Sequence, residues 1–389
     1  MQTKTTRRYL AGSTLVLALA LLIPGTSLSQ GTIDFDSATI TVGRGARWIA
    51  VGDFNRDGNP DVVTMNDSDD NISVLLGNGA GGFSSQTKFP VGDGPRAAVL
   101  FGSAPIPSLA VAHRNDDTVW ILPPDGQGGF RVDQAVKLTA GNNAASPNPD
   151  GPTSIVSGAF NRDNIPDLAT CEIDGDTVTL ILGKVDGSFD IKTTSLRVPG
   201  TPAATDADPR SISFADFNGD GNIDFVTANH DSRTIAILRG DGAGNLQAQI
   251  LQLGNNPIVA STADVDKNGT QDIVVTDRTT GTLITQVGNG MGGFEFGDEY
   301  TVDPGGRPEA STQADFNGDG NVDVVVAGRD SNKVFVMLGD GKGRFSLSGQ
   351  ANVGRGPRAV AVVDLNKDGK QDIVVANATD GTITVLLRK

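Results

Sequence analysis

Residue types that commonly carry acid–base and metal chemistry are scarce in this chain. Its 389 residues include one cysteine, two histidines, two tyrosines and two tryptophans. The single cysteine, Cys171, excludes both a disulfide framework and a cysteine-based zinc site within one chain. With two histidines, the chain also offers few residues for histidine-based catalysis or histidine-based metal binding. Chemistry at any site must therefore come mainly from carboxylates, amides and arginines.

Basic residues are also fewer than acidic ones. Lysine and arginine number 31 against 46 acidic residues, which gives a formal net charge of −15. Such an acidic chain is a poor match for duplex nucleic acid or an anionic membrane surface. We therefore expect no nucleic-acid partner.

Long hydrophobic runs are absent except at the N-terminus. Lys4, Arg7 and Arg8 precede an apolar run over residues 10–23, and the small residues Ser27 and Ser29 follow it. The run is too short for a typical membrane-spanning helix and is typical of a removable secretory signal. We predict a signal peptide over residues 1–29, the alternative being a buried N-terminal helix. Its removal takes the formal charge from −15 to −18, because it carries three basic residues and no acidic ones. We expect a secreted protein, extracellular or periplasmic, with no stable membrane insertion after cleavage.

Glycine is abundant, and it marks a repeat. The chain has 50 glycines without a collagen period, and its 38% hydrophobic content is enough for a core. The hexapeptides that start at residues 53, 216, 264, 315 and 364 are near copies, reading DFNRDG, DFNGDG, DVDKNG, DFNGDG and DLNKDG. A degenerate copy, AFNRDN, starts at residue 159, and a copy without carboxylates starts at residue 102. Seven copies at spacings of 48 to 57 residues indicate seven structural units.

Each unit contains four short apolar runs separated by turns rich in Gly, Asn and Asp. In the last unit three runs cover residues 359–363, 372–376 and 382–387. Four strands repeated seven times predict an all-β fold, a seven-bladed β-propeller over residues 30–389. A linear β-solenoid is the alternative. The last unit stops after its third strand, so we expect residues 33–42 to supply its outer strand and close the ring.

The repeated loop has the pattern D-x-[DN]-x-[DN]-G-x-x-D, which places hard oxygen ligands at fixed intervals. Calcium takes six to eight such oxygens, and the glycine permits the sharp turn that folds them inward. The alternative is a set of Asx-rich turns with no ion. Five complete loops predict about five calcium sites, whereas the loops at 102 and 159 are expected to be empty or weak. The predicted side-chain ligands are Asp53, Asn55, Asp57 and Asp61; Asp216, Asn218, Asp220 and Asp224; Asp264, Asp266, Asn268 and Asp272; Asp315, Asn317, Asp319 and Asp323; and Asp364, Asn366, Asp368 and Asp372. The predicted backbone carbonyl ligands are those of Asn59, Asn222, Thr270, Asn321 and Lys370.

These loops resemble the FG-GAP repeat family, also called VCBS-type repeats, which includes the integrin α-chain propeller. The resemblance covers about residues 33–389. It implies a seven-bladed propeller with calcium in the loops that join the first and second strands of a blade. It also implies extracellular adhesion or ligand recognition.

The opposite face is the predicted ligand face. Arg47, Arg96, Arg210 and Arg358 each lie six residues before the start of a repeated loop, where blades enter the central channel. Four guanidiniums there can either bind an anionic sugar or carboxylate or tie adjacent blades to local carboxylates, and we favour the ties.

Two function classes remain open at this point. The first is a monomeric recognition or adhesion module, not an enzyme, that binds an extracellular glycan or protein. The second is a calcium-dependent polysaccharide lyase or hydrolase. The residues available for catalysis are few: His113, Cys171 at the end of a predicted strand, and Glu172 with Asp174 in a predicted loop.

Overall fold

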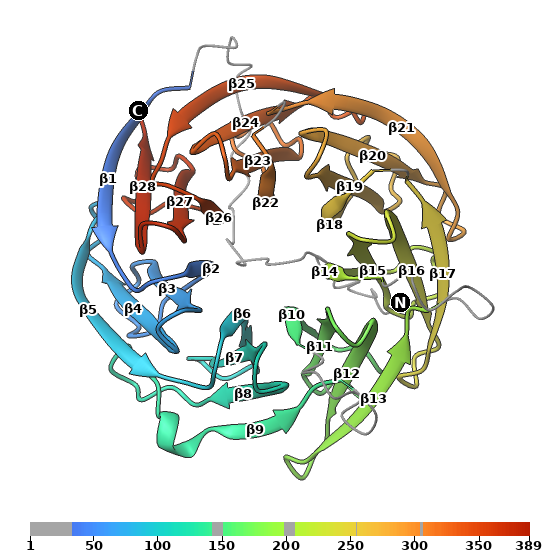
Figure 1. Cartoon of the computed structure of the whole chain (residues 1–389), viewed down its shortest axis with the longest axis horizontal. Helices are drawn as coiled ribbons and strands as arrows, with labels where there is room; N and C mark the ends of the chain where they lie inside the picture. The colour runs from blue at the N-terminus through green and yellow to red at the C-terminus, as the bar shows by residue number, and fades with distance from the viewer. Residues whose placement is uncertain (1–32, 142–150, 198–206, 254, 304–305) are drawn as a thin grey trace, which may run out of the picture.

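The computed structural model describes residues 33–141, 151–197, 207–253, 255–303 and 306–389, so the predicted signal peptide lies outside the described residues. The described chain forms 28 β-strands and one short 3₁₀ helix, η1 (Val132–Gln134). The strands make seven four-stranded antiparallel sheets, arranged as blades around a central axis (Figure 1). The predicted seven-bladed propeller is confirmed.

Blades 1 to 3 follow one another along the chain. Their strands are β2 (Ala46–Gly52), β3 (Asp61–Asn66), β4 (Asn71–Gly77) and β5 (Phe83–Pro90); β6 (Pro95–Phe101), β7 (Ser108–His113), β8 (Thr118–Leu122) and β9 (Val136–Thr139); and β10 (Pro152–Gly158), β11 (Asp167–Glu172), β12 (Thr177–Gly183) and β13 (Phe189–Ser195).

Blades 4 to 6 repeat this order, and blade 7 completes the ring. Their strands are β14 (Pro209–Ala215), β15 (Asp224–Asn229), β16 (Thr234–Gly240) and β17 (Leu246–Gln252); β18 (Pro257–Ala263), β19 (Asp272–Asp277), β20 (Thr282–Gly288) and β21 (Phe294–Thr301); β22 (Pro308–Ala314), β23 (Asp323–Gly328), β24 (Lys333–Gly339) and β25 (Phe345–Asn352); and β26 (Pro357–Val363), β27 (Asp372–Asn377) and β28 (Thr382–Arg388) with β1 (Phe35–Thr41).

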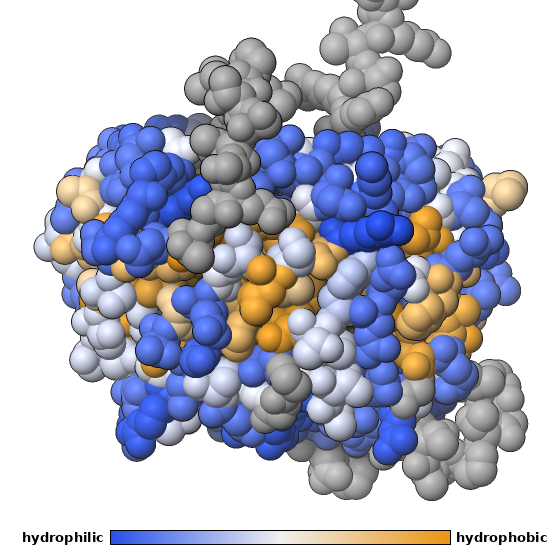
Figure 2. Space-filling model, turned by 90° about the horizontal axis from the view of Figure 1, so that it is seen from above, coloured by the Kyte–Doolittle hydropathy of each residue, from blue (hydrophilic) through white to orange (hydrophobic). Residues whose placement is uncertain are grey.

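Burial within a blade explains the sequence pattern of its strands. The second strand of each blade, such as β3, is buried along its whole length, except at Ser108 of β7, because neighbouring blades cover both faces. It is therefore a continuous apolar run closed by polar residues. The outer strand, such as β5, is largely exposed, and only its two phenylalanines, Phe83 and Phe89, are partly buried. In Figure 2 hydrophilic residues cover both rims of the ring, and hydrophobic residues gather between them on the outer wall.

The ring is closed by the N-terminal strand, as predicted. β1 pairs antiparallel with β28 in continuous register from Phe35 opposite Arg388 to Thr41 opposite Thr382. The sheet order β1-β28-β27-β26 makes blade 7 from both ends of the described chain (Figure 1). No outer edge of β28 remains unpaired, which removes a site for edge-to-edge association.

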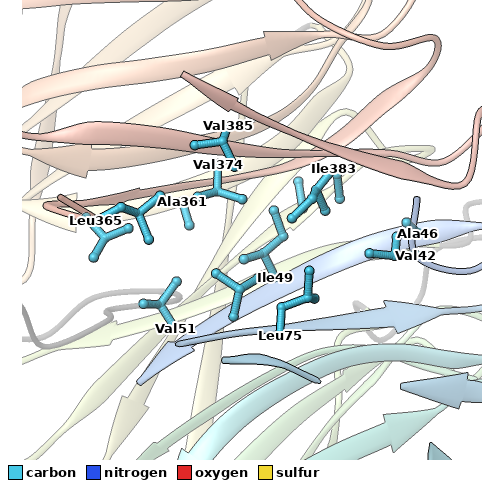
Figure 3. Packing of buried hydrophobic residues seen from close by; sticks show 14 residues of the cluster. Val42, Ala46, Ile49, Val51, Leu75, Ala361, Leu365, Val374, Ile383 and Val385 are labelled. Carbon is cyan, nitrogen blue, oxygen red and sulfur yellow. The ribbon is translucent and has the colours of Figure 1, made fainter. Parts of the chain in front are cut away.

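The core lies between blades. At the closure, Ile49 and Leu75 of blade 1 pack against Val374 and Val385 of blade 7 in a cluster of 14 buried residues (Figure 3). Six further clusters fill the ring. Since each cluster joins two blades, the blades stabilise one another rather than folding around separate cores.

Candidate functional site

Five acidic loops connect the first and second strands of blades 1, 4, 5, 6 and 7, and each is folded by the same hydrogen bond. The N–H of the loop glycine donates to the Oδ2 of the first aspartate. This distance is 2.9 Å in all five pairs, namely Gly58 and Asp53, Gly221 and Asp216, Gly269 and Asp264, Gly320 and Asp315, and Gly369 and Asp364. The five glycines have φ between 78° and 86°, a conformation that strongly favours glycine.

The third and fifth loop positions also converge. Asn55 Oδ1 accepts from the Asp57 N–H at 3.0 Å, and Asn55 Nδ2 donates to Asp57 Oδ2 at 3.0 Å. Corresponding contacts join Asn218 to Asp220 and Asn317 to Asp319. The predicted ligands of a loop are therefore brought together around one point.

Blade 5 shows most directly that such a loop suits a cation. Carboxylate oxygens of Asp264, Asp266 and Asp272 lie within 4.8 Å of one another. The Oδ1 atom of Asp264 is buried and has no hydrogen-bond partner. Crowded carboxylates with a buried, unsatisfied oxygen are costly without a positive charge between them. Their all-oxygen chemistry fits calcium.

The residue at the seventh loop position contacts the rest of the loop through its backbone N–H. The N–H groups of Asn59, Asn222, Thr270, Asn321 and Lys370 donate to the side-chain oxygen at position 5, at 2.7–2.8 Å. The side chains of Thr270 and Asn321 donate instead to the carbonyls of Gly288 and Gly339.

The ninth position has a second role that the sequence analysis did not anticipate. Asp61 is fully buried, and its carboxylate accepts the Phe54 N–H at 2.7 Å and the Gly77 N–H at 2.8 Å. It therefore ties the loop to the end of the third strand. The same two bonds occur at Asp167, Asp224, Asp272, Asp323 and Asp372.

Burial raises the pKa of these ninth-position carboxyls. The pKa of Asp61, Asp224 and Asp272 rises to about 6, and that of Asp323 to about 7, chiefly because of desolvation and further because of the neighbouring loop carboxylates. Accepted backbone N–H groups act in the opposite direction in every case. Each complete loop thus holds more negative charge than its surroundings stabilise.

The two incomplete loops carry less of this charge, with two carboxylates in blade 3 and none in blade 2. In blade 3, Ala159 replaces the first aspartate, and Asn164 occupies the glycine position at φ 61°. Arg162 of this loop turns to the next blade, where its Nε donates to Asn222 Oδ1 at 3.0 Å. The blade 2 loop, residues 102–108, contains no carboxylate. Asp167 is nevertheless kept, because the strand tie requires it.

The opposite end of the first strands forms the mouth of the central channel. Each of the seven first strands has a register shift at its second residue. A β-bulge redirects the extra side chain, and all seven of these residues line one central cavity of about 110 Å³. They are Arg47, Arg96, Thr153, Arg210, Ile258, Glu309 and Arg358.

The four predicted arginines all form ion pairs there. Arg47 and Arg96 both contact Asp67 of blade 1, so that carboxylate joins two blades. Arg210 contacts Asp208 at 2.6 Å, and Arg358 contacts Glu309 of the preceding blade at 3.6 Å. The pairs of Arg96 and Arg358 join adjacent blades, whereas Arg47 pairs within blade 1 and Arg210 pairs with a residue two positions before it.

Three of the four residues considered for catalysis are buried, whereas Asp174 is exposed and contacts Arg114 at 3.4 Å. His113 packs on Trp120, and burial lowers its pKa to about 3. Cys171 is also buried, and burial raises its pKa to about 12. Glu172 was expected in an exposed loop, but it ends β11, where Thr177 and Thr179 donate to its carboxylate at 2.8 and 3.1 Å. Because these threonine hydroxyls hydrogen-bond to the Glu172 carboxylate, this end of the strand can be buried.

Comparison with known proteins agrees with this architecture. A model of the FG-GAP-like repeat matches residues 53–102, 160–227, 216–275, 264–326 and 315–375. A comparison with curated protein sequences finds no match. Among the described residues, no helix is long and apolar enough to span a membrane.

Solved structures show the same fold at low identity. BBS1N, crystallised in complex with ARL6DN, is 13% identical with a TM-score of 0.64, over 92% of this chain and 97% of that one. Virginiamycin B lyase from Staphylococcus aureus is 13% identical with a TM-score of 0.61, over 91% and 99%. The periplasmic gluconolactonase of Pseudomonas aeruginosa is 19% identical with a TM-score of 0.55, over 80% and 86%. Binding proteins and enzymes both use this fold, so the fold alone does not decide between them.

Proposed function

Because this chain belongs to the FG-GAP-like repeat family, we propose that it is an exported, calcium-stabilised propeller that recognises an extracellular glycan or protein. The observation that carries the calcium part is the repetition of one loop geometry in five blades. In each loop the same 2.9 Å bond presents a ring of hard oxygens. Turns that served only to reverse the chain would not need three carboxylates each.

Calcium has a structural role in this proposal. The ion would be held by the side chains at positions 1, 3, 5 and 9 and by the carbonyl at position 7, and when bound it supplies positive charge between crowded carboxylates. The chain's own residues then fix the ends of the first three strands of the blade, because position 9 already links the loop to the third strand. Binding to the native state alone stabilises that state by mass action.

Titration of calcium-stripped protein by calorimetry tests this role. We expect about five sites and a higher melting temperature with calcium. Asp216→Ala should remove one site, because it deletes the first ligand of the blade 4 loop. Asp163→Ala, in the incomplete blade 3 loop, is the matched control and should leave the number of sites unchanged. Unchanged melting on calcium addition would contradict the proposal.

Recognition is favoured over catalysis because three of the four candidate catalytic groups are buried, and the exposed one, Asp174, pairs with Arg114. An enzyme that cleaves polysaccharides would need an accessible acid–base pair, whereas His113, Cys171 and Glu172 are enclosed by neighbouring strands. A binding module needs only shaped loops on a rigid ring. We propose that it acts as a monomer.

A glycan array probed with and without calcium separates the two classes. Binding that requires calcium, with no product released, is the expected result. New reducing or unsaturated ends from a polysaccharide would overturn it in favour of a lyase or hydrolase. N-terminal sequencing of the protein recovered from the medium or periplasm should begin at Gln30, which tests the export step.

A further inference from the structure

The bulged residues at the channel mouth carry more positive charge than their partners neutralise. The cavity lining contains four arginines and one glutamate. Beyond the lining, Arg278 and Arg329 contact Glu309 at 2.8 and 3.3 Å. Counting the ion-pair partners, six guanidiniums share three carboxylates, those of Asp67, Asp208 and Glu309, and His230 lies 3.4 Å from Asp208. An excess of cations in one place is notable on a chain whose net charge is −15.

These guanidiniums are also poorly solvated. The side chains of Arg96, Arg278 and Arg358 are only 13, 14 and 19% exposed. Burial lowers the pKa of Arg96 to about 9, with the nearby charge of Arg47 as the next cause. Burial likewise lowers the pKa of Arg358 to about 10, although Glu309 opposes the shift. The Nε atoms of Arg210 and Arg278 are buried and have no hydrogen-bond partner. Folding has already removed most of the water from these donors. An added anion can therefore bind them strongly, because the protein has no further desolvation cost.

The remaining walls of the cavity suit a hydroxylated organic molecule rather than a bare inorganic ion. Trp48 lies in the lining, and its Nε1–H donates to Ala98 O at 2.8 Å, which fixes the indole ring. The hydroxyls of Ser154 and Ser211 also line the cavity and accept backbone N–H groups, so their protons are free to donate. Ile258 and Ala359 add apolar surface. Guanidiniums, hydroxyls and one aromatic ring together match a carboxylate on a sugar ring.

We propose that the seven bulged residues form a binding pocket for a sugar acid, with Arg96, Arg210 and Arg358 facing its carboxylate. The pocket lies on the face opposite the acidic loops, since the first strands begin at the bulges and end at those loops. The inference rests on the proposed recognition function and specifies its ligand class. The ion pairs seen in the structure then have two roles, because they tie blades together and hold the guanidiniums in place for the ligand.

The test is calorimetric titration of the calcium-loaded protein with D-galacturonate, D-galactose and sulfate. We expect galacturonate to bind at least tenfold more tightly than galactose, which has the same ring without the carboxylate, and tenfold more tightly than sulfate. Equal binding of sulfate would overturn the sugar-acid assignment, and so would equal binding of galactose or no binding of galacturonate. Trigalacturonate distinguishes the source of the ligand: tighter binding than the monomer indicates the end of an acidic polysaccharide, whereas equal binding indicates a free sugar acid. Both results support the pocket.

Variants locate the site. Arg96→Gln with Arg358→Gln should weaken galacturonate binding at least tenfold, whereas Arg344→Gln, an exposed arginine in a turn on the acidic-loop face, should leave it unchanged. The paired variant also removes two ties between blades, so Ile258→Glu provides a second test that removes no ion pair. The next blade carries Glu309 at the same position, so the fold accepts this residue, and the new carboxylate should abolish binding. Unchanged binding in Ile258→Glu would exclude this pocket. Failure of galacturonate alongside a positive glycan array would refute this inference and leave the proposed function standing.

Discussion

At the residue scale, the ninth-position aspartates combine a candidate ligand with a backbone tie. Asp167 isolates the second role, because its loop has Ala159 in place of the first aspartate and Asn164 in place of the glycine, while both backbone bonds remain, at 2.8 Å each. A buried carboxylate with two N–H donors cannot be removed without leaving those donors unsatisfied.

Asp167→Ala should therefore lower the free energy of unfolding by about 2–4 kcal/mol, from two unsatisfied buried N–H groups. The loss should be equal with calcium and with chelator, because blade 3 is expected to hold no ion. Chemical denaturation in both conditions measures it. A loss seen only with calcium would indicate that this loop binds an ion after all. The exposed Asp163→Ala is the control and should change stability little.

His113 supplies a pH test at the same scale. Its ring is buried on Trp120, 4.9 Å between centroids, and its pKa falls to about 3 in the fold against 6.5 for the free side chain. The unfolded chain thus binds the proton more tightly, so this group makes stability fall as the pH drops below about 6.5.

His113→Phe, which keeps a ring beside Trp120, should remove that dependence. Relative to wild type, the variant should gain about 2 kcal/mol between pH 7 and pH 5. Denaturation curves at the two pH values measure the difference. An identical change with pH in both proteins would show that His113 is not held neutral in the fold.

At the scale of elements, the sequence predicts the strands well because each has a local cause. The buried run of β27 and the largely exposed outer strands follow from how many faces are covered, and the turns follow from glycine and asparagine. The number of blades follows from counting loops. Closure by β1 was also predictable, since the last unit lacked one strand.

Other features depend on side-chain environments that no local pattern encodes. The position of Arg47 before its loop could be predicted, but the bulge that turns Arg47 into the channel could not, because a register shift depends on how two strands pair. Burial of Glu172 was missed for a similar reason. Its partners, Thr177 and Thr179, lie on the next strand, and a charged residue at a strand end resembles a loop residue until that pairing is known.

Removal of the closing strand, β1, should lower the stability of the ring. A chain that begins at residue 44 loses β1, including Phe35 and Ile40, which pack against the cores on either side of blade 7. Burial of such side chains contributes about 1.5–3 kcal/mol each. We expect the melting temperature to fall by roughly 10 °C relative to a chain that begins at residue 33. Identical melting of the two chains would show that β1 does not secure the ring.

At the scale of the whole molecule, charge is separated between the two faces of the ring. Carboxylates of five loops gather on one face, and guanidiniums gather at the channel mouth on the other. Like charges on the acidic face also repel one another within a loop: burial is the main cause of the raised pKa of Asp272, and the charges of Asp266 and Asp264 raise it further. Calcium at five sites would offset about ten of those negative charges.

Salt should therefore replace part of the effect of calcium. The Debye length falls from about 10 Å at 0.1 M to about 3 Å at 1 M ionic strength, so added NaCl weakens repulsion among exposed loop carboxylates. In chelator the melting temperature should rise with NaCl, whereas in calcium it should change much less. Asp266→Asn removes one of the three crowded charges in blade 5 and should reduce the salt dependence in chelator. If salt dependence is the same with and without calcium, repulsion within the loops is not what calcium relieves, and the ions would have to stabilise the ring through geometry alone.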